Sequence, residues 1–457
     1  MFGGCPPHSQ SEARLLEVNM RRISILAGIF AMCLVSIAGA QRPAPKAQLG
    51  KHLQNRMTNL LSKAKKRAQF GSYAFPAVVF DTSKIWDLGV YPGGTAAALQ
   101  SINDFGVAIG WGDVPIEGGT ETRMIGIPLL GYNAGHWFES GVTAGEDDTA
   151  EAGGISNTGI IVGNRMGSNG QPEAYAWTPN HAGFLLGKYP GDDGGGAIAI
   201  NHSGTLIVGN SYKQLDDGFF QARPLVWTSK VIWTNGRPTL SWEMHVLPAG
   251  GLEKQGAVFP GITLDAWGGW GVNDLGQIAG DGWHHDPILD QWWEIAVVWT
   301  QIKGGTEWKI QRLPMAPGYT YNEALAINDF GEIVGDVWEG NAFPALYKQD
   351  PKNKKWSVHV LPATPKLDYG WNVAWSINDL GDIVGYCTDE NWIPKATRWT
   401  SHTPSFVMTL GSPGDTSISL GVNNLGIAAG LYQNIVSYDE NGYPIFGPNQ
   451  AVAVRFR

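Results

Sequence analysis

The stretch Ala324–Gly335 reads ALAINDFGEIVG, and Ala374–Gly385 repeats it as AWSINDLGDIVG. Each stretch is a short apolar run, an Asn-Asp-x-Gly turn and a second apolar run that ends in Gly. The Asn side chain can hydrogen-bond the backbone two residues on, and the turn Gly supplies the positive φ that closes such a hairpin. The flanking runs are too short for helices, so they predict two antiparallel strands joined by a tight turn.

This hairpin pattern recurs seven times along the 457 residues. The turns are Asn103–Gly106, Ser156–Gly159, Asn201–Gly204, Asn273–Gly276, Asn328–Gly331, Asn378–Gly381 and Asn423–Gly426. Their first residues are spaced by 53, 45, 72, 55, 50 and 45 residues. A period of this size is typical of repeat proteins, in which each unit buries its apolar face against its neighbours.

Two further strands complete each unit. One centres on a leucine followed by Gly or Pro, as in Leu88-Gly89 and Leu361-Pro362. The other ends in an aromatic residue and occurs eight times: Ala77–Phe80, Gly135–Phe138, Ala174–Trp177, Pro224–Trp227, Ala296–Trp299, Pro344–Tyr347, Ala396–Trp399 and Ala453–Phe456. Four strands in each of seven units make 28, and the extra aromatic strand lies at the C-terminal end.

The surplus strand favours a circular fold. If Ala453–Phe456 pairs beside Ala77–Phe80, the chain closes into a ring without open sheet edges. We therefore predict an all-β fold, a seven-bladed β-propeller of four-stranded blades closed by the C-terminal strand. A linear solenoid and stacked sandwiches are the alternatives, but a solenoid would need a cap at each end.

The repeat resembles the HAF-repeat family of predicted extracellular repeat proteins. The resemblance rests on Leu88-Gly89 with Pro92-Gly93-Gly94, on Ala324–Gly335 and on Ala174–Trp177, and it covers about residues 75–457. Ser156, His202 and Asn424 depart from the turn pattern, as does the spacing of 72 residues before Asn273. The family implies export and a propeller-like fold, and it implies no catalytic residues.

Residues 20–40, MRRISILAGIFAMCLVSIAGA, have the form of a secretory signal peptide, with a basic start, an apolar run and small residues at the cleavage site. We expect 1–40 to be an N-terminal extension and signal peptide with its start at Met20, and 73–457 to be the propeller. An uncleaved anchor is the alternative, but the run is shorter than the ~20 apolar residues of a span. The mature chain is therefore expected to be secreted, extracellular or periplasmic, with no integral membrane span.

Charge separates the N-terminal region from the rest of the chain. Residues 1–70 hold 11 of the 32 Lys and Arg but only 2 of the 41 Asp and Glu. The basic segment 41–72 has apolar residues at helical spacing, which predicts a helix or linker that docks on the acidic body or lies on an anionic membrane surface. The acidic body repels phosphates, so we expect no nucleic-acid partner. Cys387 is alone after residue 40, so it is expected to be a packing residue.

Alternating strand directions sort the loops onto two faces. The Asn-Asp-x-Gly turns share one face, and the loops that follow the Gly-ended strands share the other, which we call the variable face. Aromatic and acidic residues gather on the variable face, where a rigid scaffold commonly carries binding residues. The predicted binding residues are Trp283, His284, His285, Asp286, Asp290, Trp292, Trp293, Asp216, Asp217 and Trp392, with Tyr321 and Trp371 on the same face.

Aromatic faces and carboxylates together suit sugars, so we expect an exported binding or interaction propeller whose ligand is a glycan or a protein. The alternative is a carbohydrate-active hydrolase or lyase that uses acids on the same face, with its catalytic residues unknown. His284, His285, Asp286 and Asp290 could ligate a metal only from a loop, because neighbouring strand residues face opposite ways. We expect no metal and no cofactor, and the sequence predicts no oligomeric state.

Overall fold

The computed structural model describes residues 84–139, 150–178, 181–214, 220–234, 237–248, 266–286, 291–302, 306–363, 369–402, 407–412, 414–439 and 444–456. The chain divides into two units, Met1–Asp81 and Thr82–Arg457, and the described residues all belong to the second. The predicted signal peptide, the basic segment and the strand Ala77–Phe80 lie outside them. No helix occurs among the described residues, so none of them offers a helical segment able to span a membrane.

The described part of the chain is all-β, and most of its strands form four-stranded antiparallel sheets. The first three sheets in chain order are β2 (Ala97–Ile102), β3 (Val107–Ile116), β4 (Gly119–Pro128) and β5 (Phe138–Glu139); β6 (Ala150–Ile155), β7 (Ile161–Met166), β8 (Pro172–Thr178) and β9 (His181–Leu185); and β10 (Gly194–Ile200), β11 (Leu206–Gln214), β12 (Phe220–Thr234) and β13 (Arg237–Val246). The fourth is β14 (Ala266–Val272), β15 (Gln277–Asp286), β16 (Gln291–Gln301) and β17 (Trp308–Arg312).

The next eight strands are joined in one sheet. They are β18 (Tyr321–Ile327), β19 (Ile333–Glu339), β20 (Asn341–Gln349) and β21 (Trp356–Val360), followed by β22 (Tyr369–Ile377), β23 (Asp382–Thr388), β24 (Pro394–Thr400) and β25 (Val407–Thr409). A single parallel bridge, Ala342 to Trp371, connects the two sets of four. The strands β26 (Thr416–Val422), β27 (Ile427–Gln433) and β30 (Gln450–Arg455) form the last sheet with β1 (Lys84–Gly89), and β28 (Ile435–Tyr438) pairs with β29 (Pro444–Phe446) as an extra hairpin.

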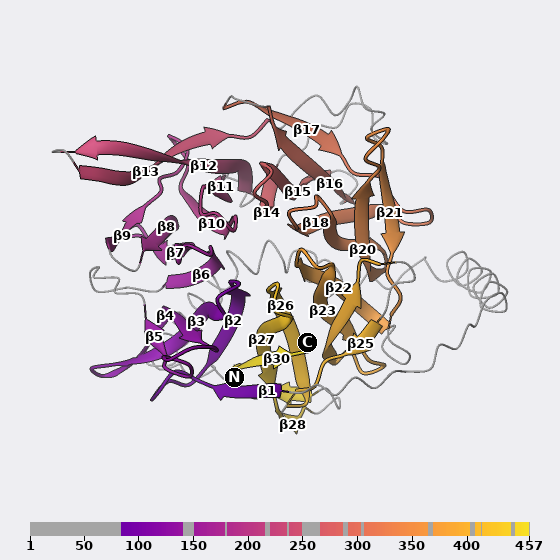
Figure 1. The fold of residues 1–457 in the computed structure, drawn as a ribbon. Helices are drawn as coiled ribbons and strands as arrows, with labels where there is room; N and C mark the ends of the chain where they lie inside the picture. The colour runs from indigo at the N-terminus through magenta and orange to yellow at the C-terminus, as the bar shows by residue number, and fades with distance from the viewer. Residues whose placement is uncertain are drawn as a thin grey trace, which may run out of the picture. The chain divides into compact units, whose positions relative to one another are not determined.

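Each sheet packs against the next in chain order, which is the arrangement of a β-propeller (Figure 1). The core lies between neighbouring sheets, and the repeated tryptophans sit in it: Trp227, Trp299 and Trp399 are fully buried. Each of their indole N–H groups donates to a backbone carbonyl at the end of the preceding sheet's outer strand, at Leu186, Pro248 and Pro362 respectively. The predicted core role is confirmed for these three, whereas Trp177 is only partly buried.

The second strand of each hairpin does not end at its Gly as predicted. In every repeat the first strand carries a β-bulge opposite this Gly, and the second strand continues past it. A Cβ atom at Gly110, Gly163, Gly209, Gly280, Gly335, Gly385 or Gly430 would lie 1.9–2.2 Å from a carbonyl oxygen of the first strand. The Gly is therefore required by a close approach between two strands at the bulge.

Replacing Gly385 by alanine should destabilise the propeller by about 1–3 kcal/mol, since the new methyl group would collide with the carbonyl oxygen of Val373 and force the backbone apart. Urea unfolding of Gly385→Ala against the parent measures the loss. Gly119→Ala is the matched control, because a Cβ atom there meets nothing within 4 Å. Equal stability of the two variants would contradict the close-approach explanation.

One aromatic strand was predicted at the wrong place. Gly135–Phe138 is not the third strand of the first sheet; β4 takes that position, and Phe138 belongs to the short outer strand β5. Ile127 of β4 pairs with Ala108, as Trp177 pairs with Ile161 in the following sheet. An isoleucine stands where five other repeats have an aromatic residue, which is why the pattern missed it; the last repeat has Val454 at this position.

The last sheet combines the two ends of the described chain (Figure 1). The strand β30 lies between β1 and β27 and pairs antiparallel with both. The predicted partner of Ala453–Phe456 was Ala77–Phe80, and this is wrong, because both edges of β30 are taken by Lys84–Gly89 and Ile427–Gln433. The leucine strand of the first sequence unit is thus the outer strand of the last sheet.

Candidate functional site

Four carboxylates meet between two neighbouring sheets. Asp281 of β15 and Glu294 of β16 come from one sheet, and Glu323 of β18 and Asp336 of β19 come from the next. One carboxylate oxygen from each of Asp281, Glu294 and Glu323 lies within 4.8 Å of the other two. Asp336 is the register partner of Glu323 across β18 and β19. The sequence places Asp281 and Asp336 directly after the close-approach Gly of their repeats.

Burial disfavours the charged forms of these carboxyl groups. Asp281 and Asp336 are 2% and 1% exposed. Burial raises the pKa of Asp281 to about 6 and that of Asp336 to about 7. Burial and the neighbouring carboxylates hold the pKa values of Glu294 and Glu323 well above their usual range. Glu294 is only partly buried, so the group is reachable from solvent through its side chain.

Several polar atoms in this group have no partner in the protein. By distance and angle, the Oδ1 atoms of Asp281 and Asp336 accept no hydrogen bond, and the Nε1–H groups of Trp270 and Trp338 donate none. The neighbouring groups still act on the carboxyls: Glu294 lowers the pKa of Asp281, Glu323 lowers that of Asp336, and Trp338 lowers that of Glu294, each against the larger effect of burial. The Trp270 indole lies close enough to Asp281 to lower the pKa of its carboxyl, but it does not meet hydrogen-bond geometry. A buried polar group without a partner costs about 1–3 kcal/mol, so the arrangement favours a ligand that brings both donors and acceptors.

Three aromatic rings adjoin the carboxylates. The rings of Tyr321 and Trp338 stack with centroids 3.9 Å apart, and Trp371 tilts against Trp338 at 5.7 Å. Burial, Glu339 and Glu294 raise the pKa of Tyr321, which places this ring beside the carboxylate group. Tyr321 and Trp338 are partly exposed. We call these rings, Trp270 and the four carboxylates the acid–aromatic site.

The acid–aromatic site lies toward the strand ends opposite the turns, on the side predicted to bind. Trp338 follows the close-approach Gly335 along β19, and Tyr321 begins β18, far from its turn at Asn328. Tyr321 and Trp371, both placed on the variable face by the sequence, belong to the site. Asp281, Glu294, Glu323 and Asp336 were missed because the strands are longer than expected. Asp281 and Asp336 follow the Gly at which their strands were expected to end, and Glu294 and Glu323 precede the expected strand starts at Ala296 and Ala324.

The predicted Trp283–Trp293 cluster is a paired hairpin. Trp283, His284, His285 and Asp286 belong to β15, and Trp292 and Trp293 belong to β16. Their backbones pair in register, with Trp283 opposite Glu294 of the acid–aromatic site. The two histidines are consecutive strand residues and do not lie in the loop that a shared metal would need. Asp290, Asp216 and Asp217 lie outside the described residues.

Trp392 lies in the tight turn between β23 and β24, where it has a positive φ of 63° and is 55% exposed. Its ring packs over Gly370, at which a Cβ atom would come within 2.4 Å of the indole. The next residue, Trp371, contacts Trp338. Trp392 is thus linked to the acid–aromatic site by packing contacts through Gly370 and its neighbour Trp371.

The turns on the opposite face are hydrogen-bonded to one another in a continuous series, which we call the turn ring. At five steps the amide of the second turn residue donates to the side chain of the next turn: Asp104 to Asn157, Asp274 to Asp329, Asp329 to Asp379, Asp379 to Asn424, and Asn424 to Asp104. The other two steps run from the Asn157 amide to the His202 carbonyl and from the Ser203 amide to Asp274. The series returns from Asn424 to Asp104, and Asp or Asn side chains are the acceptors at six of its seven steps.

The turn chemistry inferred from the sequence is confirmed. The turn Gly has a positive φ in all seven repeats. The side chains of Asn103, Asn273, Asn328 and Asn423 accept a hydrogen bond from the backbone two residues on. The side-chain amides of Asn103, Asn273, Asn328, Asn378 and Asn423 also donate to the first carbonyl of the next turn. The last of these bonds joins Asn423 to Asn103.

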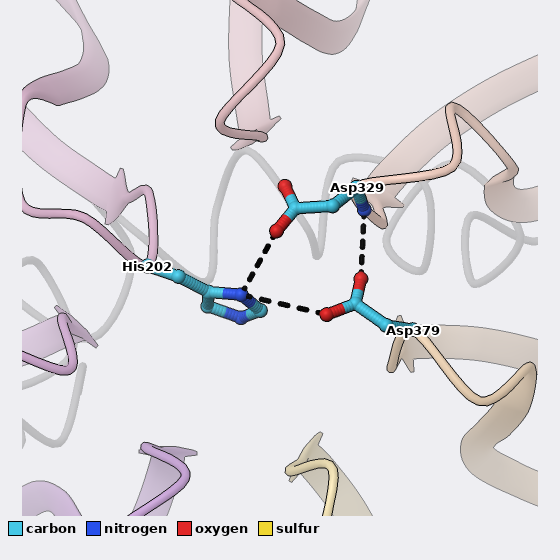
Figure 2. Close-up of side chains that lie close together, drawn as sticks. All are labelled: His202, Asp329 and Asp379. Carbon is cyan, nitrogen blue, oxygen red and sulfur yellow. Dashed lines mark hydrogen bonds and ion pairs between the residues drawn. The ribbon is translucent and has the colours of Figure 1, made fainter.

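His202 departs from the turn pattern and reaches other turns with its ring (Figure 2). Its Nδ1 lies 3.3 Å from Asp329 and 3.8 Å from Asp379, two and three turns further along the chain. The hydrogen bond to Asp329, together with the charges of Asp104, Asp329 and Asp379, raises the pKa of His202 to about 9. The imidazolium is the one cation among these aspartates in the described turns, so it holds turns of distant repeats together.

His202 should make stability depend on pH. Its folded pKa is raised above its unfolded value, so its contribution is complete below about pH 6.5 and is lost as the pH rises through about 9. The side chain is 40% exposed, so solvent screening limits the effect to about 1 kcal/mol. As the pH rises from about 6.5 to about 9, the melting temperature of the His202→Asn variant should therefore fall less than that of the parent. Parallel melting profiles would contradict the ion pair.

No protein-family model and no curated protein matches the chain. Among solved structures it is similar to the β-propeller domain of the Trilobed protease from Pyrococcus furiosus, at 12% identity and a TM-score of 0.41 over 78% of this chain and 93% of that one. It is also similar to Trypanosoma rangeli sialidase (15% identity, TM-score 0.40, 70% and 56% covered) and to Pyrococcus horikoshii acylaminoacyl peptidase (11%, 0.44, 80% and 52%). The chain spans about half the length of the latter two. At this level of similarity the likenesses assign no activity to the chain.

Proposed function

We propose that the chain is an exported binding protein, a seven-bladed propeller closed by its C-terminal strand, whose acid–aromatic site binds a glycan. Closure is supported by the turn ring, which returns from the last turn to the first, and by the pairing of β1 with β30. Export is supported by the signal-like residues 20–40. The repeat motifs that resemble the HAF-repeat family support both parts of the proposal.

The glycan is favoured by the partly exposed groups of the site. A sugar hydroxyl can donate to a carboxylate. Glu294, the partly exposed carboxylate of the group, offers such an acceptor, whereas Asp281, Asp336 and the indole N–H groups of Trp270 and Trp338 are buried. The partly exposed rings of Tyr321 and Trp338 offer the apolar surface that the C–H face of a sugar ring needs. This combination is the observation on which the proposed ligand rests.

A glycan-array screen of the full chain tests this function. Trp338→Ala should weaken the affinity for any glycan found by about tenfold or more, because it removes a partly exposed stacking surface. Trp356→Ala is the matched control, since this partly buried tryptophan lies on β21, away from the acid–aromatic site. The absence of glycan binding, or equal binding by the Trp338→Ala variant, would refute the proposal.

The acids also support the alternative of a hydrolase or lyase. A carboxyl whose pKa is raised to about 6, as at Asp281, can act as a general acid near neutral pH, and an ionised neighbour could serve as base or nucleophile. The test is turnover in a broad polysaccharide panel. Under this alternative Asp281→Asn keeps glycan binding but loses turnover, whereas a binding protein shows no turnover before or after the substitution.

A further inference from the structure

We propose that Asp281, Glu294 and Glu323 bind a divalent cation, with calcium as the preferred ion. This site goes beyond glycan binding, because the cation needs only the protein's own carboxylates. The three ligands come from β15, β16 and β18, so the ion would bridge two neighbouring sheets of the propeller.

The spacing of the carboxylates fits a shared ion. One oxygen from each of the three side chains lies within 4.8 Å of the other two. Calcium binds oxygen at about 2.3–2.6 Å, so three ligand oxygens spread evenly around one ion stand about 4.0–4.5 Å apart. The limit of 4.8 Å lies close to this range, so small side-chain shifts would let a single calcium ion touch all three carboxylates. Asp336, opposite Glu323 in the register, adds a further buried carboxyl to the group.

Unfilled polar groups point to a ligand independently of the carboxylate spacing. Asp281 is 2% exposed, yet its Oδ1 atom accepts no hydrogen bond from the protein. Trp270 is 8% exposed, its Nε1–H donates to nothing, and it lies beside Asp281. An ion supplies the missing contact for the carboxylate oxygen, and a water molecule on the ion supplies an acceptor for the indole.

The donor set selects the kind of cation. The three ligands are carboxylates, without histidine or cysteine, which favours hard ions such as calcium and magnesium over zinc. Magnesium demands a near-ideal octahedron at about 2.0–2.1 Å, whereas calcium tolerates irregular geometry from several strands. The second group of close ligand atoms, His202 with Asp329 and Asp379, already contains its own positive partner.

Calcium titration of the full chain after treatment with a chelator tests the proposal without any glycan. Isothermal titration should show one site, and saturating calcium should raise the melting temperature by about 5 °C. Asp281→Asn and Glu294→Gln should each weaken calcium binding by at least about tenfold. Both variants replace a carboxyl of a crowded group by a neutral amide of similar size, so they should melt no lower than the calcium-free parent, and this result would show that they fold.

The control is Glu390→Gln, which changes an exposed acid of the variable face and should keep the full calcium response. Absence of calcium binding in the parent would overturn the proposal, and so would an unchanged response in both cluster variants. Glu294 is the more exposed ligand, so its variant remains informative if Asp281→Asn fails to fold. Since no sugar is present, failure here leaves glycan binding untouched, and failure of the glycan screen leaves the calcium result untouched.

Discussion

Trp399→Ala is expected to destabilise the propeller by about 4 kcal/mol. Trp399 is fully buried among the apolar side chains of the two sheets that it joins, including Val334, Ile377 and Ile383. Its Nε1–H donates to the Pro362 carbonyl at 2.8 Å. The substitution removes the packing of a large ring, creates a cavity and leaves a carbonyl without its donor. Each of these changes lowers the free energy of unfolding.

Urea unfolding measures this loss, and Trp392→Ala is the control. Trp392 is another tryptophan of the same sheet, but it is 55% exposed and lies in a turn outside the core. Its replacement should change stability by less than about 1 kcal/mol. If the two variants lose the same stability, the repeated tryptophan does not hold neighbouring sheets together.

Glu151→Gln is expected to reduce by about 3 kcal/mol the amount by which the free energy of unfolding falls between acid and mildly alkaline pH. Glu151 of β6 is 4% exposed, and burial raises its pKa to about 7. A folded pKa above the unfolded one means that the contribution is present below about pH 4.5 and is lost as the pH rises through about 7. The glutamine variant has no charge to bury, so it should equal the parent in acid and exceed it in mild alkali.

The measurement is the difference in urea midpoint between about pH 5 and about pH 8, taken for parent and variant. Glu390→Gln, at an exposed acid, should leave the parent's difference unchanged. A Glu151→Gln variant that keeps the parent's full pH dependence would show that the Glu151 carboxyl is not forced to take up a proton on folding.

The repeated hairpin could be predicted from the sequence because its chemistry is local. Asn in the first turn position and Gly in the fourth are needed within a few residues, so the motif shows in every repeat, with Ser156 in place of Asn in one of them, and the structure confirms both roles. The extent of the strands could not be predicted in this way. Gly335 and its equivalents look like strand ends, but they mark a bulge where two backbones approach closely.

The acid–aromatic site depends on contacts between repeats, and these leave no local trace. Asp281 and Glu323 are separated by a hairpin, an outer strand and a turn, and they meet only because two sheets pack together. The sequence did indicate the right side of the fold through Tyr321, Trp371 and Trp392. It also singled out His202 as a departure from the turn pattern, but nothing local shows that its ring reaches Asp329.

A designed disulfide between the two ends of the described chain tests whether the propeller closes. Lys84 of β1 and Arg455 of β30 are register partners. With Cys5 and Cys33 replaced by serine and Cys387 buried, Lys84→Cys/Arg455→Cys should form this bond under mild oxidation, as peptide mass spectrometry would show. The control pair Lys84→Cys/Lys352→Cys should stay reduced. Failure of the first pair to link, or equal linking of the control, would mean that the ring does not close through β1 and β30.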